Sequence, residues 1–125
     1  MRRTSFFIGF VLVVDNDCIF CKIIAGKVPS QRIAENDSLI VIKDIAPKTS
    51  IHYLIIPKKH IVNIQFLAKE DISLAGDIFL MAKELASQLS GSQAFRLVSN
   101  NGADSGQKVF HLHIHFLAGK HLSDF

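Results

Sequence analysis

The sequence predicts a single α+β domain built on a largely antiparallel sheet. Five short apolar segments of strand length are separated by turn residues, and one long segment repeats its apolar residues at helical spacing. Strands joined by turns, one long helix and a closing strand are typical of this fold class. A chain of 125 residues, 49% of them hydrophobic, is long enough to bury one core.

The first half of the chain predicts a short helix followed by three strands. Residues 20–25 form the short helix, because Gly26 can end it and Pro29 prevents its continuation. The segments that follow are apolar and β-branched, and the polar turn of residues 35–38 separates the first two of them. The three strands are expected at residues 31–34, 39–43 and 52–56.

The second half predicts the long helix and two further strands. Between residues 71 and 89 apolar side chains recur at the spacing of one buried helix face, and Gly91 can end the helix. That face consists of Ile72, Ala75, Phe79, Ala82, Ala86 and Leu89. Strands are expected at residues 95–99 and 109–117, joined by the turn-rich loop of residues 100–106.

The charge distribution and the N-terminal segment argue against two classes of protein. The net charge is +3, but the lysines and arginines are scattered and do not form the dense basic stripe of a nucleic-acid binder. The apolar run of residues 6–14 is too short to span a bilayer. It resembles a signal peptide but has no small-residue cleavage site before Asp15. We therefore expect an N-terminal extension at residues 1–14 on a cytoplasmic protein that binds neither nucleic acid nor membrane.

Three histidines alternate with apolar residues in the last predicted strand, as His111-Leu112-His113-Ile114-His115. Because successive side chains of a strand face opposite sides, the histidines would share one face and the apolar residues the other. Residues four apart on a strand are about 13 Å apart, so His111 and His115 cannot bind one metal ion together. Two interpretations stay open: a zinc site completed by ligands from elsewhere, and a histidine nucleophile.

The nucleophile interpretation favours the central histidine. A neutral imidazole attacks phosphorus when one ring nitrogen is unprotonated and the other donates its proton to a fixed acceptor. His113 has neighbours on both sides that can supply hydrogen bonds. Just upstream, Gly106 allows a close backbone approach, Gln107 brings an amide, and the next backbone N–H groups can face an anion.

Several segments together resemble the histidine-triad (HIT) family, and its Hint branch most closely. Residues 106–117 resemble the family signature, in which three histidines alternate with apolar residues. The other matching stretches, in the family's order and spacing, are residues 18–24, 44–47, 52–60 and 98–102. The resemblance covers about residues 15 to 119 and implies a HIT domain at residues 15–125. It also implies a HIT-like fold, a five-stranded sheet with one long and one short helix, extended across a homodimer.

The resemblance implies hydrolysis or transfer at the α-phosphate of a nucleoside 5′-phosphoramidate or another adenylylated nucleotide. His113 would form a nucleotidyl-histidine intermediate, from which water releases the nucleoside monophosphate. The carbonyl of His111 would hold the proton-bearing nitrogen of His113, while His115 and His52 complete the polar surround. Catalysis would require no cofactor.

A purine nucleotide such as AMP is the ligand that the resemblance implies. Asp44 matches the ribose-binding carboxylate of the family, apolar side chains match the base pocket, and the loop before the histidines would meet the phosphate. The residues expected at the nucleotide are Phe20, Ile23, Asp44, Ile45, Asn100, Gly106, Gln107, Lys108 and Val109.

A structural zinc ion is a separate expectation. Some family members hold zinc with two cysteines and two histidines, and Cys18, Cys21, His60 and His111 match this pattern. Four such ligands leave no open position for chemistry, so the ion would act only by fixing the backbone beside His113. Alternatively, the two cysteines are small buried thiols or, in a secreted chain, a redox or disulfide pair.

Two departures from the Hint pattern bear on the activity. Lys108 stands where these proteins usually carry a serine, which leaves the leaving-group preference open. Residues 120–125 lack the tryptophan-containing tail of many relatives. A dinucleoside polyphosphate hydrolase and a nucleotide-binding interaction module with little turnover are therefore kept as alternatives.

Overall fold

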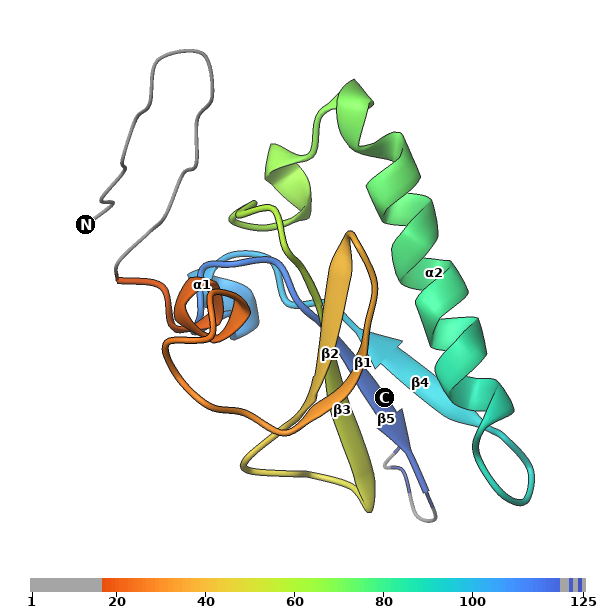
Figure 1. The fold of residues 1–125 in the computed structure, drawn as a ribbon. Coiled ribbons are helices and arrows are strands. Elements are labelled where there is room, and N and C mark those ends of the chain that lie inside the picture. The colour runs from red at the N-terminus through yellow and green to blue at the C-terminus, as the bar shows by residue number, and fades with distance from the viewer. Residues whose placement is uncertain (1–16, 120–121, 123, 125) are drawn as a thin grey trace, which may run out of the picture.

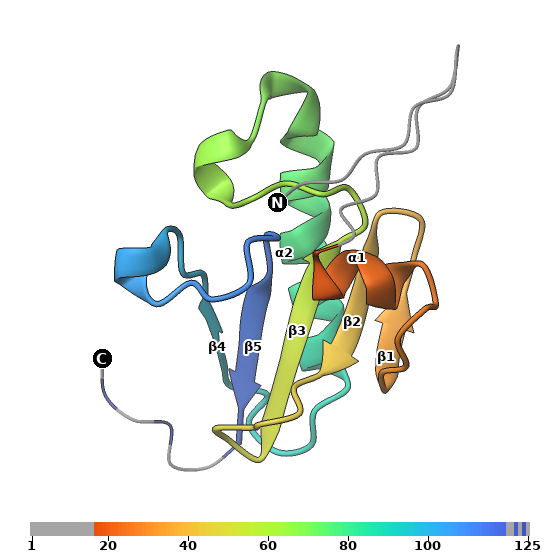
Figure 2. The same cartoon turned by 90° about the vertical axis from the view of Figure 1, so that its left-hand side faces the viewer.

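A five-stranded antiparallel sheet carries one helix on each face (Figures 1 and 2). The structure, a computed structural model, describes residues 17–119, 122 and 124. The strand order across the sheet is β1-β2-β3-β5-β4. The strands are β1 (Arg32–Glu35), β2 (Leu39–Lys43), β3 (Ile51–Pro57), β4 (Phe95–Val98) and β5 (Ile114–Ala118). The expected extension at residues 1–14 lies outside the described residues.

The predicted fold class is confirmed, and the start of β5 is the largest difference in strand bounds. The sequence predicted a strand from residue 109, whereas β5 begins at Ile114, so His111 and His113 precede it. The partner strand β3 ends at Pro57, which has no N–H to continue the ladder. The chain before β5 is instead held by a bond from the Leu112 N–H to the carbonyl of Ile61, at 2.6 Å.

The two faces of the sheet bury different sets of side chains. On one face of the sheet, every second residue of β2, β3 and β5 points toward α2 (Ile72–Ser87). These side chains form one core, which includes Leu39, Val41, Ile55, Ile114 and Phe116. The opposite face packs against α1 (Ile19–Ile24), and its core includes Cys18, Phe20, Cys21, Ile40, Leu54 and Ile56. The alternation predicted for the histidine segment holds, since Leu112 and Ile114 belong to the α2 core. The histidines therefore belong to the α1 side of the sheet.

The buried face of α2 was predicted only in part. Ile72 and Phe79 were assigned to this face, but they are 72% and 67% exposed. The buried residues of the helix are Ile78, Met81, Ala82, Leu85 and Ala86. Their spacing puts three large side chains against the sheet, whereas the predicted stripe contained three alanines. The larger apolar area buried by Ile78, Met81 and Leu85 decides the orientation of the helix.

Three single turns of 3-10 helix connect the main elements: η1 (Ile64–Phe66), η2 (Lys69–Asp71) and η3 (Ala103–Ser105). The first two lead into α2, and η3 lies in the loop between β4 and the histidines. Within the described part of the chain, no helix combines the length and the apolar character needed to span a bilayer.

Candidate active site

A pocket of about 290 Å³ opens on the α1 side of the sheet and contains two of the three alternating histidines. Its walls come from α1, the loop between β2 and β3, β3 itself, the loop on both sides of η3, and β5. The lining residues are Phe20, Asp44, Ala46, Lys48, His52, Leu54, Asn100, Gly106, Lys108, Val109, His113 and His115. A larger hollow of about 680 Å³ lies near Gly119, and none of the described residues in its wall is ionisable. The smaller pocket, which contains several ionisable side chains, is therefore the better candidate for a reactive site.

His113 has the geometry of a nucleophile. Its Nδ1–H donates to the backbone carbonyl of His111 at 2.7 Å, which leaves Nε2 of the neutral ring unprotonated. The ring of Phe20 packs edge-on against it, with 5.1 Å between centroids. Burial is the main cause that lowers the pKa of His113, so the ring is neutral at neutral pH. A neutral imidazole with one fixed proton is the form that attacks phosphorus.

A second hydrogen-bonded pair, His52 and His115, lies beside the nucleophile. The backbone N–H of Lys48 donates to Nδ1 of His52 at 3.1 Å, so the neutral ring carries its proton on Nε2. That nitrogen lies 2.9 Å from Nδ1 of His115 and donates to it. His115 is thereby left with its proton on Nε2. This tautomer makes His115 a hydrogen-bond donor next to His113, whose ring centroid is 5.2 Å away.

Both members of this pair are uncharged at neutral pH. Burial lowers the pKa of His52, and the positive charge of Lys48 acts in the same direction while Asp44 opposes it. Burial, followed by the neighbouring His113 and His52, lowers the pKa of His115 to about 4. The pocket is therefore lined by neutral imidazoles, and its formal charges come from Asp44, Lys48 and Lys108.

The loop before the histidines is held rigidly by the side chain of Gln107. Its amide nitrogen donates to the carbonyls of Val62 and Val109, at 2.8 and 3.0 Å. Its amide oxygen accepts from Asn63 and from the N–H of Gly102, at 3.1 and 2.8 Å. The sequence predicted that this amide would meet a phosphate, but in the structure its oxygen and its nitrogen each have two partners within the protein. The amide stabilises the loop instead.

Backbone donors next to Gln107 are better placed for an anion. In the part of the chain that the structure describes, no intramolecular hydrogen bond uses the N–H of Lys108 or of Val109. Both residues line the pocket with His113, and Gly106 before them has a φ of 102°, in the left-handed region that favours glycine. Successive unpaired N–H groups after such a glycine can form an anion-binding concavity.

The other expected site residues divide into two groups. Phe20, Asp44 and Asn100 line the pocket that contains His113. Ile23 is buried in the α1 core, and Ile45 is fully exposed beside Asp44, so neither is in the pocket wall. Lys48 and Leu54 line the pocket but were not singled out from the sequence. The position of Lys48, four residues after Asp44 and four before His52, was a signal that could have indicated it.

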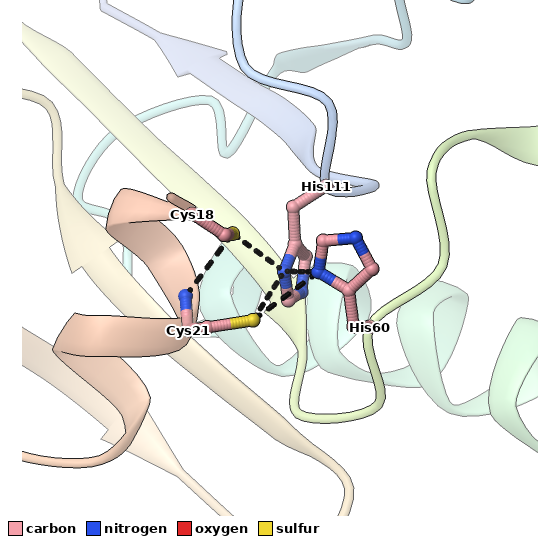
Figure 3. Close-up of side chains that lie close together, drawn as sticks. All are labelled: Cys18, Cys21, His60 and His111. Atoms are coloured by element: carbon pink, nitrogen blue, oxygen red, sulfur yellow. Dashed lines mark hydrogen bonds between the residues drawn. The ribbon is translucent and has the colours of Figure 1, made fainter. Parts of the chain in front are cut away.

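His111 lies outside the pocket, in a cluster with Cys18, Cys21 and His60 (Figure 3). Nδ1 of His111 is 3.3 Å from Sγ of Cys18 and 3.1 Å from Nδ1 of His60. Sγ of Cys21 is 3.2 Å from Nδ1 of His60. The four side chains thus direct one ligand atom each toward a common point, and all these atoms lie within 4.8 Å of one another.

Comparisons with known proteins identify the family. A family model described as the scavenger mRNA decapping enzyme C-terminal binding domain matches residues 17–125. An uncharacterised HIT-like protein from Synechocystis is 44% identical over 107 residues, which are 86% of this chain and 94% of the relative. The chain belongs to the histidine-triad (HIT) family. The crystal structure of a HIT family hydrolase from Legionella pneumophila matches at a TM-score of 0.80 and 37% identity, covering 85% of this chain and 96% of that one.

Membership in the HIT family supports a nucleotide-hydrolase or nucleotide-binding role in general terms. It also bears on the cluster around His111. A zinc-bound HIT family protein from Mycobacterium smegmatis matches at a TM-score of 0.69 and 31% identity, covering 80% of this chain and 73% of that chain.

The residues of the cluster fit a structural zinc ion. Zinc bond lengths of about 2.3 Å to sulfur and 2.0–2.1 Å to nitrogen put neighbouring ligand atoms about 3.3–3.8 Å apart in a tetrahedron. Four of the six distances between these ligand atoms run from 3.1 to 3.6 Å, and all six are within 4.8 Å. Nε2–H of His111 donates to the carbonyl of Pro57 at 2.8 Å, which leaves Nδ1 unprotonated toward the cluster. Hydrogen bonding with Cys21, and then with His111 and His60, lowers the pKa of Cys18 against the effect of burial, which favours a thiolate ligand.

Proposed function

We propose that the protein hydrolyses or transfers the nucleotidyl group of adenylylated nucleotides, including nucleoside 5′-phosphoramidates, through a nucleotidyl-His113 intermediate. The observation that carries the proposal is the 2.7 Å bond from Nδ1 of His113 to the carbonyl of His111. It fixes the tautomer in which Nε2 is unprotonated, in a pocket that also holds backbone donors and a carboxylate. That combination fits in-line attack on a phosphate ester or amide.

In the first step, Nε2 of His113 bonds to the α-phosphorus while the bond to the leaving group breaks. The N–H groups of Lys108 and Val109 would stabilise the charge on the phosphoryl oxygens. Nε2–H of His115 would donate to the phosphate or to the leaving atom, since the chain of bonds from Lys48 through His52 fixes its tautomer. Water then attacks the phosphorus and releases the nucleoside monophosphate.

The nucleotide would bind along the wall formed by α1 and β3. Asp44 uses one carboxylate oxygen to accept from the N–H of Ala46 at 2.8 Å, and the other, 3.3 Å from Nε2 of His52, would accept from ribose hydroxyls. Phe20, Leu54 and Val109 provide apolar contact for a base. Apolar walls discriminate weakly between bases, which supports a broad purine preference.

Trapping the intermediate tests the function. Adenosine 5′-phosphoramidate is mixed with the protein, quenched in base, and the modified residue is mapped by mass spectrometry. His113→Gln should abolish both the adduct and turnover, whereas His115→Gln should slow turnover but still form an adduct on His113. Near-normal hydrolysis by His113→Gln would refute the nucleophile. Tight AMP binding with no adduct and no turnover of any substrate would favour the interaction module instead.

We propose in addition that Cys18, Cys21, His60 and His111 hold one structural zinc ion per chain. When bound, the ion would supply fixed geometry and no reaction step, because all four positions are filled by protein. Thiolate zinc ligands are typical of reducing compartments, which supports the proposed cytoplasmic location. Elemental analysis of protein purified without chelator should give about one zinc per chain, and Cys21→Ser should lower that ratio. A zinc content far below one per chain would refute the proposal.

A homodimer is the assembly that the exposed apolar surface supports. Phe79 and Leu80 of α2 are 67% and 63% exposed, and Phe79 lines a groove of about 370 Å³ together with Leu97 of β4. Strand β4 is an edge of the sheet, so a second copy could cover the groove and continue the sheet. Analytical ultracentrifugation should show a dimer that Phe79→Asp dissociates, while Phe66→Asp, at another exposed aromatic residue, leaves it intact. A monomeric wild-type protein at micromolar concentration would refute the assembly.

A further inference from the structure

Two lysines face the same pocket as His113, and they come from different segments of the chain. Lys48 belongs to the loop between β2 and β3, and Lys108 to the loop after η3. Among the described residues that line the pocket, Asp44 alone carries a carboxylate. Two lysines and one carboxylate give this lining a positive formal charge.

Neither lysine is neutralised by the protein. Within the described part of the chain, no carboxylate forms an ion pair with Lys48 or Lys108, whereas Lys58 and Lys59 are paired with acidic partners at 2.8 and 2.7 Å. The charge of Lys48 also acts inside the pocket, because it is one of the causes, after burial, that lower the pKa of His52 and of His115. Both ammonium groups are thus available to a bound anion.

The charge of the pocket bears on the leaving group. An amine leaving group takes up a proton as it departs and leaves without negative charge, so a nearby cation has no developing charge to stabilise on it. A sulfate or phosphate leaving group needs no proton but departs with additional negative charge. Fixed cations beside the breaking bond stabilise that charge as it develops in the transition state.

We infer that Lys48 and Lys108 select adenylylated nucleotides whose leaving group departs as an anion, such as sulfate or a nucleoside polyphosphate. The inference rests on the proposed role of His113. Nε2 of His113 bonds to the α-phosphorus, the bond from phosphorus to the bridging oxygen breaks, and its electron pair stays on that oxygen. The lysines stabilise the departing anion. Water then gives its hydroxyl to phosphorus and its proton to solvent, which releases AMP and returns His113 to the neutral state.

Three substrates with the same adenosine 5′-phosphoryl group separate leaving-group charge from nucleotide recognition. Adenosine 5′-phosphosulfate releases sulfate, diadenosine triphosphate releases ADP, and adenosine 5′-phosphoramidate releases an amine. The value of kcat/KM is measured for the wild type and for K48Q, K108Q and the double variant. Lys83→Gln on the exposed surface of α2 is the matched control.

The wild type should turn over the two anionic-leaving substrates with higher kcat/KM than the phosphoramidate. For each substrate with an anionic leaving group, kcat/KM is divided by kcat/KM for the phosphoramidate. In the double variant this ratio should fall about tenfold or more, the effect expected for losing charge-assisted contacts. K83Q should leave the ratio unchanged. A fall for only one of the anionic substrates supports the inference for that leaving group alone.

Two results would overturn the inference in distinguishable ways. If His113 becomes nucleotidylated but neither ratio falls in the double variant, the lysines do not select the leaving group, and the proposed function stands. If no substrate yields an adduct on His113, the proposed function fails and the inference fails with it. Added salt gives an independent check, because screening should lower kcat/KM for the anionic-leaving substrates more than for the phosphoramidate.

Discussion

His115 should make the folded chain lose stability in acid, and replacing it should remove that loss. Burial, followed by the neighbouring His113 and His52, lowers the pKa of His115 from 6.5 to about 4. In the unfolded chain the imidazole returns to its ordinary pKa. His115→Gln keeps an amide that can hydrogen bond with His52 but cannot titrate.

The magnitude follows from the two pKa values. Below pH 6.5 the unfolded chain binds a proton at His115 that the folded chain does not bind until about pH 4. The free energy of unfolding is therefore unaffected by this residue above pH 6.5 and falls as the pH drops through the window between the two values. Each pH unit inside the window costs about 1.4 kcal/mol, so lowering the pH from 7.5 to 4.5 should cost about 2–3 kcal/mol.

Urea denaturation at pH 7.5, 6.0 and 4.5 measures this loss in the wild type and in His115→Gln. The wild type should lose about 2–3 kcal/mol more than the variant between the extremes. Other acid effects, including proton competition at the cysteine cluster, are common to both proteins and cancel in the difference. Equal losses in the two proteins would show that His115 titrates normally in the folded state and would refute the burial argument.

Three further predictions concern the ribose contact, the core and the loop. Asp44→Asn should lower kcat/KM for an adenosine substrate about 10- to 100-fold, through lost charge-assisted hydrogen bonds, and much less for its 2′,3′-dideoxy analogue; equal losses would contradict ribose binding. Phe116→Ala, at a fully buried ring stacked on Phe95, should lower the free energy of unfolding in urea by about 3–5 kcal/mol. The exposed Phe66→Ala should cost less than about 1 kcal/mol, and similar costs would refute the packing argument. Gln107→Ala should speed amide hydrogen exchange at residues 102–109, and unchanged exchange would show that the amide does not hold the loop.

Local signals in the sequence located most elements of the fold. The bounds of β2 agree with the predicted 39–43, because its apolar run is flanked by a polar turn on one side and Asp44 on the other. The orientation of α2 was harder to predict, since apolar residues occur on more than one side of the helix. Which side faces the sheet depends on how Ile78, Met81 and Leu85 fit against it, and periodicity alone does not contain that information.

The sequence indicated which residues lie near one another better than it indicated the direction in which each side chain points. Asp44, His52, His113 and His115 meet in one pocket, because they lie on or directly next to the strands β2, β3 and β5, which are neighbours in the sheet. Gln107 is next to the pocket in sequence, yet its amide turns into the protein because Asn63, Val62 and Gly102 offer it partners there. Those partners lie up to 45 residues away, so no local pattern could have indicated them.

The order of strands also has a consequence for how the protein reaches its folded state. His52 and His115 are 63 positions apart and meet only when β5 inserts between β3 and β4. A nascent chain therefore has no pocket until its residues up to 118 have left the ribosome, and until then one edge of β3 lacks its partner strand. Such a late, long-range closure is slow compared with hairpin formation and leaves a partly folded chain open to association with other chains. A nucleotide binds only after closure, so during synthesis it would act as a selective stabiliser of chains that have completed the sheet.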